Sequence, residues 1–178
     1  MITITEALAE LKTIGKRVEK KREFIGGYIA RQDGVKDPLE KDGGTIEVLK
    51  RERQAISDLQ KRHVAIRTAI QKTNQATPIT IEGMTKTIAE WLTWRKEIAP
   101  GGQSFVAKLR NSIGAARTQA QQKGLIPRSV GEAAVQPTDM LINIDEGELA
   151  REAELFETIL GTLDGQLSLK NATVMIDV

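Results

Sequence analysis

The sequence predicts a mainly α protein built on a long, coiled-coil-like antiparallel helical hairpin, with further helices and a small C-terminal β-hairpin. Two seven-residue repeats, apolar except at His63, predict the hairpin, because that spacing puts each set on one helical stripe. They are Ile4, Leu11, Val18 and Ile25, and then Leu49, Ile56, His63 and Ile70. Composition points the same way, since 40% of the residues are hydrophobic but only 3% are aromatic, as in long helices with aliphatic seams.

The first helix is expected to begin at Thr3, because Thr3 and Glu6 have the spacing of a capping box. It should weaken at Gly26-Gly27 and end between residues 22 and 31. A polar loop rich in turn residues follows over 32–44, and the second helix should run from about Thr45 to Thr73.

The hairpin predicts its own register. If the two helices are antiparallel, the numbers of facing residues sum to about 74, so that Ala7 faces Ile66 and Val18 faces Ile56. A second row of the seam lies three positions after each repeat, and Lys21 and Glu52 are charged residues in that row. The same sum places them opposite each other. We therefore expect an ion pair between them, which would disfavour slipped registers.

Beyond the hairpin, a short strand is expected at Ile79–Ile81 and a third helix over 85–98. Pro100-Gly101-Gly102 should end that helix, and Ser104 is a suitable N-cap for a fourth helix that Gly124 closes. Residues 126–139, between two prolines, look irregular.

The C-terminal part predicts a strand at 140–144 and a fifth helix from Asp145 to the stop at Asp164-Gly165. The apolar residues of the tail then alternate on either side of a turn at Lys170-Asn171, as in a β-hairpin: Leu167, Leu169, Val174, Ile176 and Val178. A terminal strand has an open edge, so it should pair within the chain or with another chain.

Charge divides the chain unevenly. Residues 1–127 hold 23 Lys and Arg against 14 Asp and Glu, whereas residues 128–178 hold 3 against 10. We therefore distinguish a basic segment, 1–127, containing the hairpin and two shorter helices, from an acidic segment, 128–178, and expect both to fold as one unit. Contact between opposite charges, in one chain or between subunits, is one reading of this pattern.

Few residues suggest chemistry. There is no Cys, and the one histidine, His63, lies on the apolar stripe of the second helix near Leu11, where a packed core residue is the expectation. Gly15-Lys16-Arg17 lacks the earlier glycine of a phosphate loop. We expect no enzyme activity, no metal and no cofactor.

Several short segments together resemble a family of small helical proteins that carry the name septicolysin, most of them of unknown function. They are Thr3-Ile4-Thr5-Glu6-Ala7-Leu8, Thr73-Asn74-Gln75-Ala76-Thr77, Glu82-Gly83-Met84-Thr85, Asn143-Ile144-Asp145 and Thr162-Leu163-Asp164. The resemblance implies a long helical hairpin with shorter helices around it and supplies no catalytic residue. Gly101-Gly102 and the stretch 115–122 have no counterpart in it.

The leading functional expectation is a non-enzymatic structural protein that assembles with itself or with another structural protein. A bacteriophage virion component, such as a head decoration or connector protein, is its concrete form. Its expected interface residues are Trp94, Val174, Ile176 and Val178. The start lacks the regions of a secretory signal and no apolar run is long enough for a membrane span, so we expect cytoplasmic synthesis without secretion or a membrane role.

The alternative is a nucleic-acid-binding module in which the basic hairpin contacts phosphates. Its candidate residues are cations on both helices: Lys16, Arg17, Lys20, Lys61, Arg62 and Arg67.

Overall fold

The computed structural model describes residues 1–130 and 139–177, and these residues form two compact units. Unit 1 comprises Met1–Ala76 and Ser168–Val178, and unit 2 comprises Thr77–Leu167. The protein is mainly α with small strand pairs, which is the predicted fold class. The charge boundary at residue 127 falls inside unit 2, so charge and compactness divide the chain at different places.

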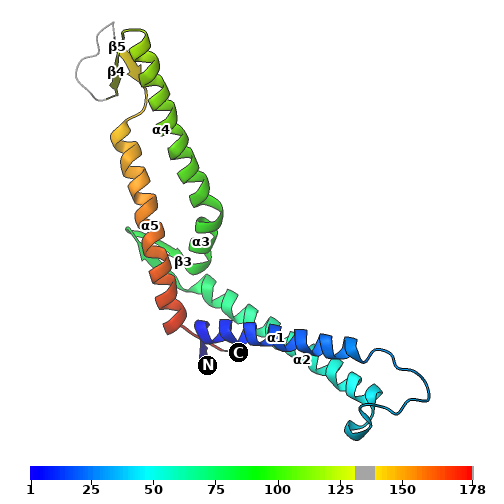
Figure 1. Cartoon of the computed structure of the whole chain (residues 1–178). Coiled ribbons are helices and arrows are strands. Elements are labelled where there is room, and N and C mark those ends of the chain that lie inside the picture. The colour runs from blue at the N-terminus through cyan, green and yellow to red at the C-terminus, as the bar shows by residue number, and fades with distance from the viewer. Residues whose placement is uncertain (131–138, 178) are drawn as a thin grey trace. The chain divides into compact units, whose positions relative to one another are not determined.

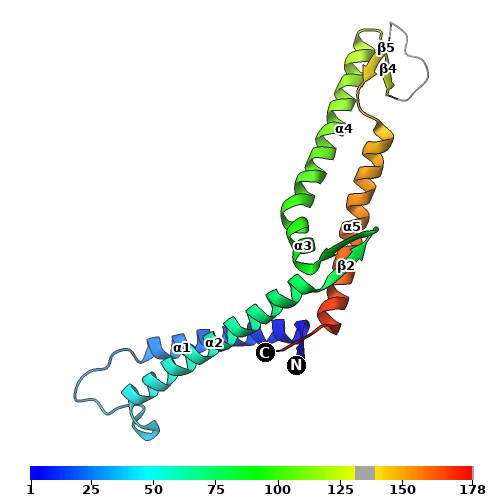
Figure 2. The same cartoon turned by 180° about the vertical axis from the view of Figure 1, so that it is seen from behind.

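Unit 1 is an antiparallel pair of long helices, α1 (Ile4–Gly27) and α2 (Thr45–Ala76), which lie side by side in Figures 1 and 2. The predicted capping box starts α1. The Glu6 amide donates to Thr3 Oγ1 at 3.1 Å, and the Thr3 amide donates to Glu6 Oε2 at 2.7 Å. Both bonds satisfy amides that have no partner inside the helix, which fixes the start of α1 at the predicted residue.

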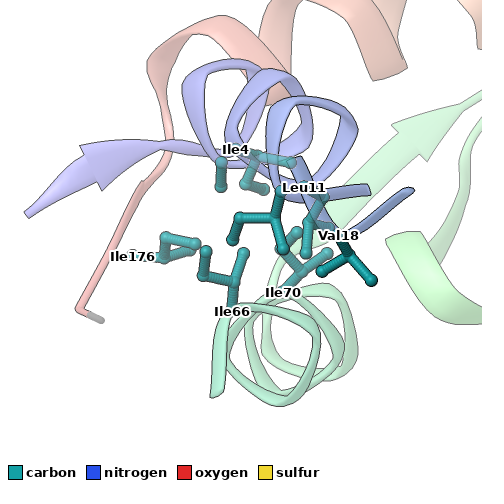
Figure 3. Packing of buried hydrophobic residues seen from close by; sticks show 8 residues of the cluster. Ile4, Leu11, Val18, Ile66, Ile70 and Ile176 are labelled. Atoms are coloured by element: carbon teal, nitrogen blue, oxygen red, sulfur yellow. The ribbon is translucent and has the colours of Figure 1, made fainter. Parts of the chain in front are cut away.

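The core of unit 1 lies between the two helices. Leu11, Ile66 and Ile176 pack together in one buried cluster, in which Ile66 is fully buried (Figure 3). The other buried members are Ile4, Ala7, Ile14, Val18 and Ile70, with Ile56 and Leu59 packed against them. The predicted facing partners Ala7 and Ile66 share this cluster, which confirms the register.

The loop between the two helices is held by Asp37. Its carboxylate accepts from the Thr45 amide at 2.9 Å, from Thr45 Oγ1 at 2.6 Å and from the Leu39 amide at 2.9 Å. A short 3-10 turn, η1 (Glu40–Asp42), follows. Asp37 therefore fixes the start of α2 from eight residues upstream.

The C-terminal helix α5 (Glu146–Thr173) continues nine residues past Asp164, so the predicted stop at Asp164-Gly165 is wrong. Ile159, Leu163 and Leu167 repeat at four-residue spacing and are buried. Burial of Leu167, in the turn after Asp164-Gly165, outweighs the cost of about 1 kcal/mol for a helical glycine.

The small strand pair at the C-terminus joins the two ends of the chain. Strand β6 (Met175–Ile176) pairs antiparallel with β1 (Ile2–Thr3), and Ile2 lies opposite Ile176. The partner of the terminal strand is thus the N-terminus and not residues 167–169, because those residues stay helical.

Unit 2 begins with a β-hairpin of β2 (Pro78–Ile81) and β3 (Met84–Thr87). The predicted strand at Ile79–Ile81 is confirmed. The next helix begins at Ile88 and not at Thr85, because Glu82 and Gly83 adopt positive φ angles of 48° and 72° and turn the chain back into a second strand.

Helix α3 (Ile88–Thr93) runs through a π-helical turn, η2 (Trp94–Ile98), into α4 (Ala99–Gln122). The predicted break at Pro100-Gly101-Gly102 and the predicted cap at Ser104 are therefore wrong. Pro100 stands in the first turn of α4, where a missing N–H is tolerated, and the wider π turn before it changes the hydrogen-bond register.

Two parallel strands separate α4 from α5. They are β4 (Ile126–Ser129) and β5 (Asp139–Ile142), so the expected irregular structure does not hold for residues 126–129. Asp145 then caps α5 by accepting from the amides of Gly147 at 2.7 Å and Glu148 at 3.1 Å. The predicted start of the fifth helix is confirmed.

Two apolar clusters hold unit 2 together. The first surrounds Trp91, which is fully buried and whose Nε1–H donates to the Ile79 carbonyl at 3.0 Å. The second joins α4, β5 and α5 through Val106, Ile113, Ile142 and Leu149.

Candidate protein interface on the helical hairpin

The expected ion pair on the hairpin seam is present. Lys21 Nζ lies 2.6 Å from Glu52 Oε2, and the two side chains are 29% and 26% exposed. Aliphatic neighbours along the seam shield both groups in part, so each charge depends on the other for a partner. The pair fixes which residues of α1 face which residues of α2.

A second pair crosses the hairpin between Arg62 and Glu10. The guanidinium donates through Nε at 2.9 Å and through an Nη at 3.2 Å to the two carboxylate oxygens. This bidentate bond lowers the pKa of Glu10 and raises the pKa of Arg62. Arg62, a candidate phosphate contact in the sequence, is therefore engaged by Glu10 within the chain.

An apolar groove of about 480 Å³ runs between α1 and α2 on one side of the seam. Ile14 and Val18 line it from α1, and His63 and Val64 line it from α2. Gly15 lines the groove without a side chain, and the space there is open, because nothing lies within 4 Å of the position that a Cβ would take. We call this open place in the lining the gap at Gly15. His63 is half-buried in this lining instead of enclosed in the core, which corrects the expectation for it.

Val64 is the most exposed apolar side chain of this groove, at 63% exposure. Leu8 stands seven residues before Gly15, on the same row of α1, and is 40% exposed. The groove and these two side chains together expose apolar surface on a long helical pair, which is the type of surface that helical partners cover.

Cations surround the groove. Arg22 lines its α1 wall, where it lies 3.7 Å from Glu19, and Gln60 lines its α2 wall. Arg53 and Arg67 stand seven residues before and after Gln60, so they extend the same row, and both are exposed. Lys12 stands seven residues before Glu19 and therefore extends the row of that residue. Glu19 is the only anion among the lining residues. We call the groove and these flanking cations the basic groove.

The other predicted interface residues lie in different surroundings. Trp94 is half-buried, stacked on Phe156 at 5.8 Å between ring centroids and set edge-on against Trp91 at 5.6 Å. Ile176 is 2% exposed inside the core of unit 1, and Val174 packs against the same cluster. Trp94 is thus engaged by two aromatic rings, and Val174 and Ile176 by the core of unit 1. Val178 lies outside the described residues.

The remaining cations proposed for nucleic acid are exposed: Lys16, Arg17, Lys20, Lys61 and Arg67. Lys61 lies 3.5 Å from Asp58 on the same helix. The set is spread around the hairpin, since Arg67 extends the groove row while Arg17 occupies the opposite flank of the seam in the heptad.

Within residues 1–130 and 139–177, no three His, Cys, Asp or Glu side chains are grouped so that they could hold a metal ion. Across the same ranges, no helix combines the length and the apolar character that crossing a membrane requires.

Comparison of the chain with protein-family models, with curated proteins and with solved structures gives no match.

Proposed function

We propose that this protein is a non-enzymatic assembly protein whose helical hairpin binds other copies of the same chain. The observation that carries the proposal is the basic groove, where an apolar channel, a side-chain gap at Gly15 and the exposed Val64 occur together. Apolar surface in this arrangement is stabilised when another helix covers it.

The construction of the hairpin supports this role. Two cross-helix ion pairs, Lys21–Glu52 and Glu10–Arg62, hold its register, and the two chain ends are joined by β1 and β6. A groove whose walls are fixed before binding loses little conformational entropy when it is occupied. A virion component, the form suggested by the sequence, would need this property, because many identical copies must meet in one geometry.

Nucleic-acid binding is the second candidate. Unit 1 carries 17 Lys and Arg against 12 Asp and Glu, a net charge of +5, which favours an anionic partner. The spread of its exposed cations around the hairpin and the engagement of Arg62 by Glu10 favour it less than a groove-centred contact.

The solution mass of the purified chain tests the proposal. Light scattering at low ionic strength should give a mass above the 19.6 kDa of one chain and should rise with protein concentration. A mass that stays at 19.6 kDa over the accessible concentration range overturns self-assembly. Binding of duplex DNA to that monomer, falling steeply with added salt, would then support the second candidate.

A further inference from the structure

One face of α5 carries an exposed aliphatic side chain and two exposed carboxylates. Leu155 is an aliphatic side chain with 42% exposure. Glu152 stands three residues before it and Glu148 seven residues before it, so both carboxylates lie on its side of the helix. Both are exposed, and neither forms an ion pair with any part of the chain that the structure describes. We call Leu155 and these two glutamates the acidic face.

The two surfaces are opposite in shape and in charge. The basic groove is open at Gly15, beside the aliphatic Ile14 and Val18 of its lining, and the acidic face has an exposed Leu155. Exposed cations flank the groove, whereas glutamates flank the leucine. Each surface also holds one charge of the other sign, Glu19 in the groove and Arg151 beside Leu155.

The net charges of the units follow the same division. Unit 1, which holds the basic groove, carries +5, and unit 2, which holds the acidic face, carries 9 Lys and Arg against 12 Asp and Glu, or −3. Two grooves facing each other would bring like charges together, whereas a groove facing an acidic face pairs opposite charges. Electrostatics therefore favours a contact between two different surfaces of two copies.

We infer that the acidic face of α5 in one copy docks in the basic groove of a second copy, with Leu155 entering the gap at Gly15. This inference rests on the proposed function and specifies its interface. Because the two surfaces differ, a pair of bound copies still offers one free groove, on the first copy, and one free acidic face, on the second. Such a head-to-tail contact extends into a ring or a filament, unlike a two-fold dimer that closes on itself.

Two single substitutions each disrupt one of the two surfaces and leave the other intact. Gly15→Leu fills the gap, and it should leave α1 folded because leucine favours the helix and open space surrounds the site. Leu155→Glu removes the aliphatic side chain and places a charge where the groove is apolar. Each variant alone should raise the dissociation constant for self-association by about tenfold or more, since both changes act at the centre of the contact.

The decisive experiment mixes the two variants. Gly15→Leu keeps an intact acidic face, and Leu155→Glu keeps an intact groove, so a mixture contains one productive contact. At a concentration above the dissociation constant of the wild type and below those of the variants, light scattering should give 19.6 kDa for each variant alone and twice that mass for the equimolar mixture. Added salt should weaken the mixed dimer, because charge pairs at an exposed rim are screened over about 10 Å at 0.1 M.

Gly114→Leu is the matched control. Gly114 is an exposed helical glycine in α4 with nothing within 4 Å of an added Cβ, so the substitution has the same chemistry away from both surfaces. It should assemble as the wild type does. Variants that still assemble like the wild type, or a mixture that stays at 19.6 kDa, overturn this interface while leaving self-assembly standing; a monomeric wild type overturns both.

Discussion

Lys21 and Glu52 meet across the hairpin of unit 1, with the lysine Nζ 2.6 Å from the glutamate Oε2. They are the two oppositely charged residues at seam positions, and they fall opposite each other because the hairpin is in the register that the repeat defines. A slip of one helix along the other would leave both charges among aliphatic side chains. The pair therefore acts mainly on the choice of register and less on stability.

Replacing one partner should be more damaging than replacing both. Glu52→Leu leaves the half-buried Lys21 ammonium without its carboxylate, and we expect the free energy of unfolding to fall by about 1 kcal/mol. The double variant Lys21→Leu, Glu52→Leu should recover most of that loss. Chemical denaturation of the three proteins measures both effects.

The double variant should also be less uniform in register. Two leucines allow the helices to slip, so we expect broader NMR resonances from the hairpin or a mixture of oligomeric states. A double variant with the same homogeneity and the same mass as the wild type would contradict the role of the pair in register.

The hairpin could be predicted because its structure is local and repetitive. The seven-residue repeat gives the buried stripe, and the antiparallel sum then places Ala7 against Ile66 and Lys21 against Glu52. The wrong predictions are mostly those that placed the end of a helix from local residue signals alone. Asp164-Gly165 is a sound local stop, but burial of Leu167 outweighs it, and burial is not visible in a local pattern.

The candidate interface was harder to predict, because packing between distant residues is not visible in a local sequence pattern. In the sequence, Gly15 stands out only as part of an incomplete phosphate loop. Its position between Ile14 and Val18 was the signal for a place without a side chain beside the seam. The terminal strand was expected to offer an open edge. Its pairing with β1 depends on a contact between residues at opposite ends of the sequence, such as Ile2 and Ile176.

Gly102 is required by the ring of Phe156. A Cβ at residue 102 would lie 2.8 Å from Phe156 Cε1 and closer still to Cζ. Gly102→Ala should therefore lower the free energy of unfolding by about 1–3 kcal/mol, although alanine favours the helix. Thermal unfolding monitored by circular dichroism gives the measurement.

The neighbouring Gly101 is the control for this effect. Nothing lies within 4 Å of a Cβ at that position. Gly101→Ala should raise stability by about 0.5–1 kcal/mol through helix propensity alone. Equal effects of the two substitutions would show that the ring of Phe156 does not occupy the space beside Gly102.

The terminal strand should stabilise unit 1 through Ile176. Ile176→Ala removes a side chain that is buried against Ile4 and Ile66, so we expect a loss of about 2–5 kcal/mol in the free energy of unfolding. Met175→Ala, on the exposed side of the same strand, should change stability by less than about 0.5 kcal/mol. Urea denaturation compares them, and similar losses for both would contradict the packing of the strand.

Asp37 should make the stability of the hairpin depend on acid. Its bonds to the Thr45 hydroxyl and amide and to the Leu39 amide, followed by the more distant Arg31 charge, lower the pKa of its carboxyl from 3.8 to about 2. Because the pKa is lower in the folded chain than in the unfolded chain, the charged form stabilises folding. That contribution is complete above pH 3.8 and disappears as the pH falls through about 2.

The variant Asp37→Asn tests this directly. It cannot ionise, so its melting temperature should fall less than that of the wild type between pH 4 and pH 2, a window set by the two pKa values. Asp33→Asn is a matched control in the same loop, because the bond that Asp33 accepts from the Gly34 amide does not reach the start of α2. Its melting temperature should follow the wild type throughout the window. If Asp37→Asn also follows the wild type, the carboxylate does not hold the start of α2 in solution.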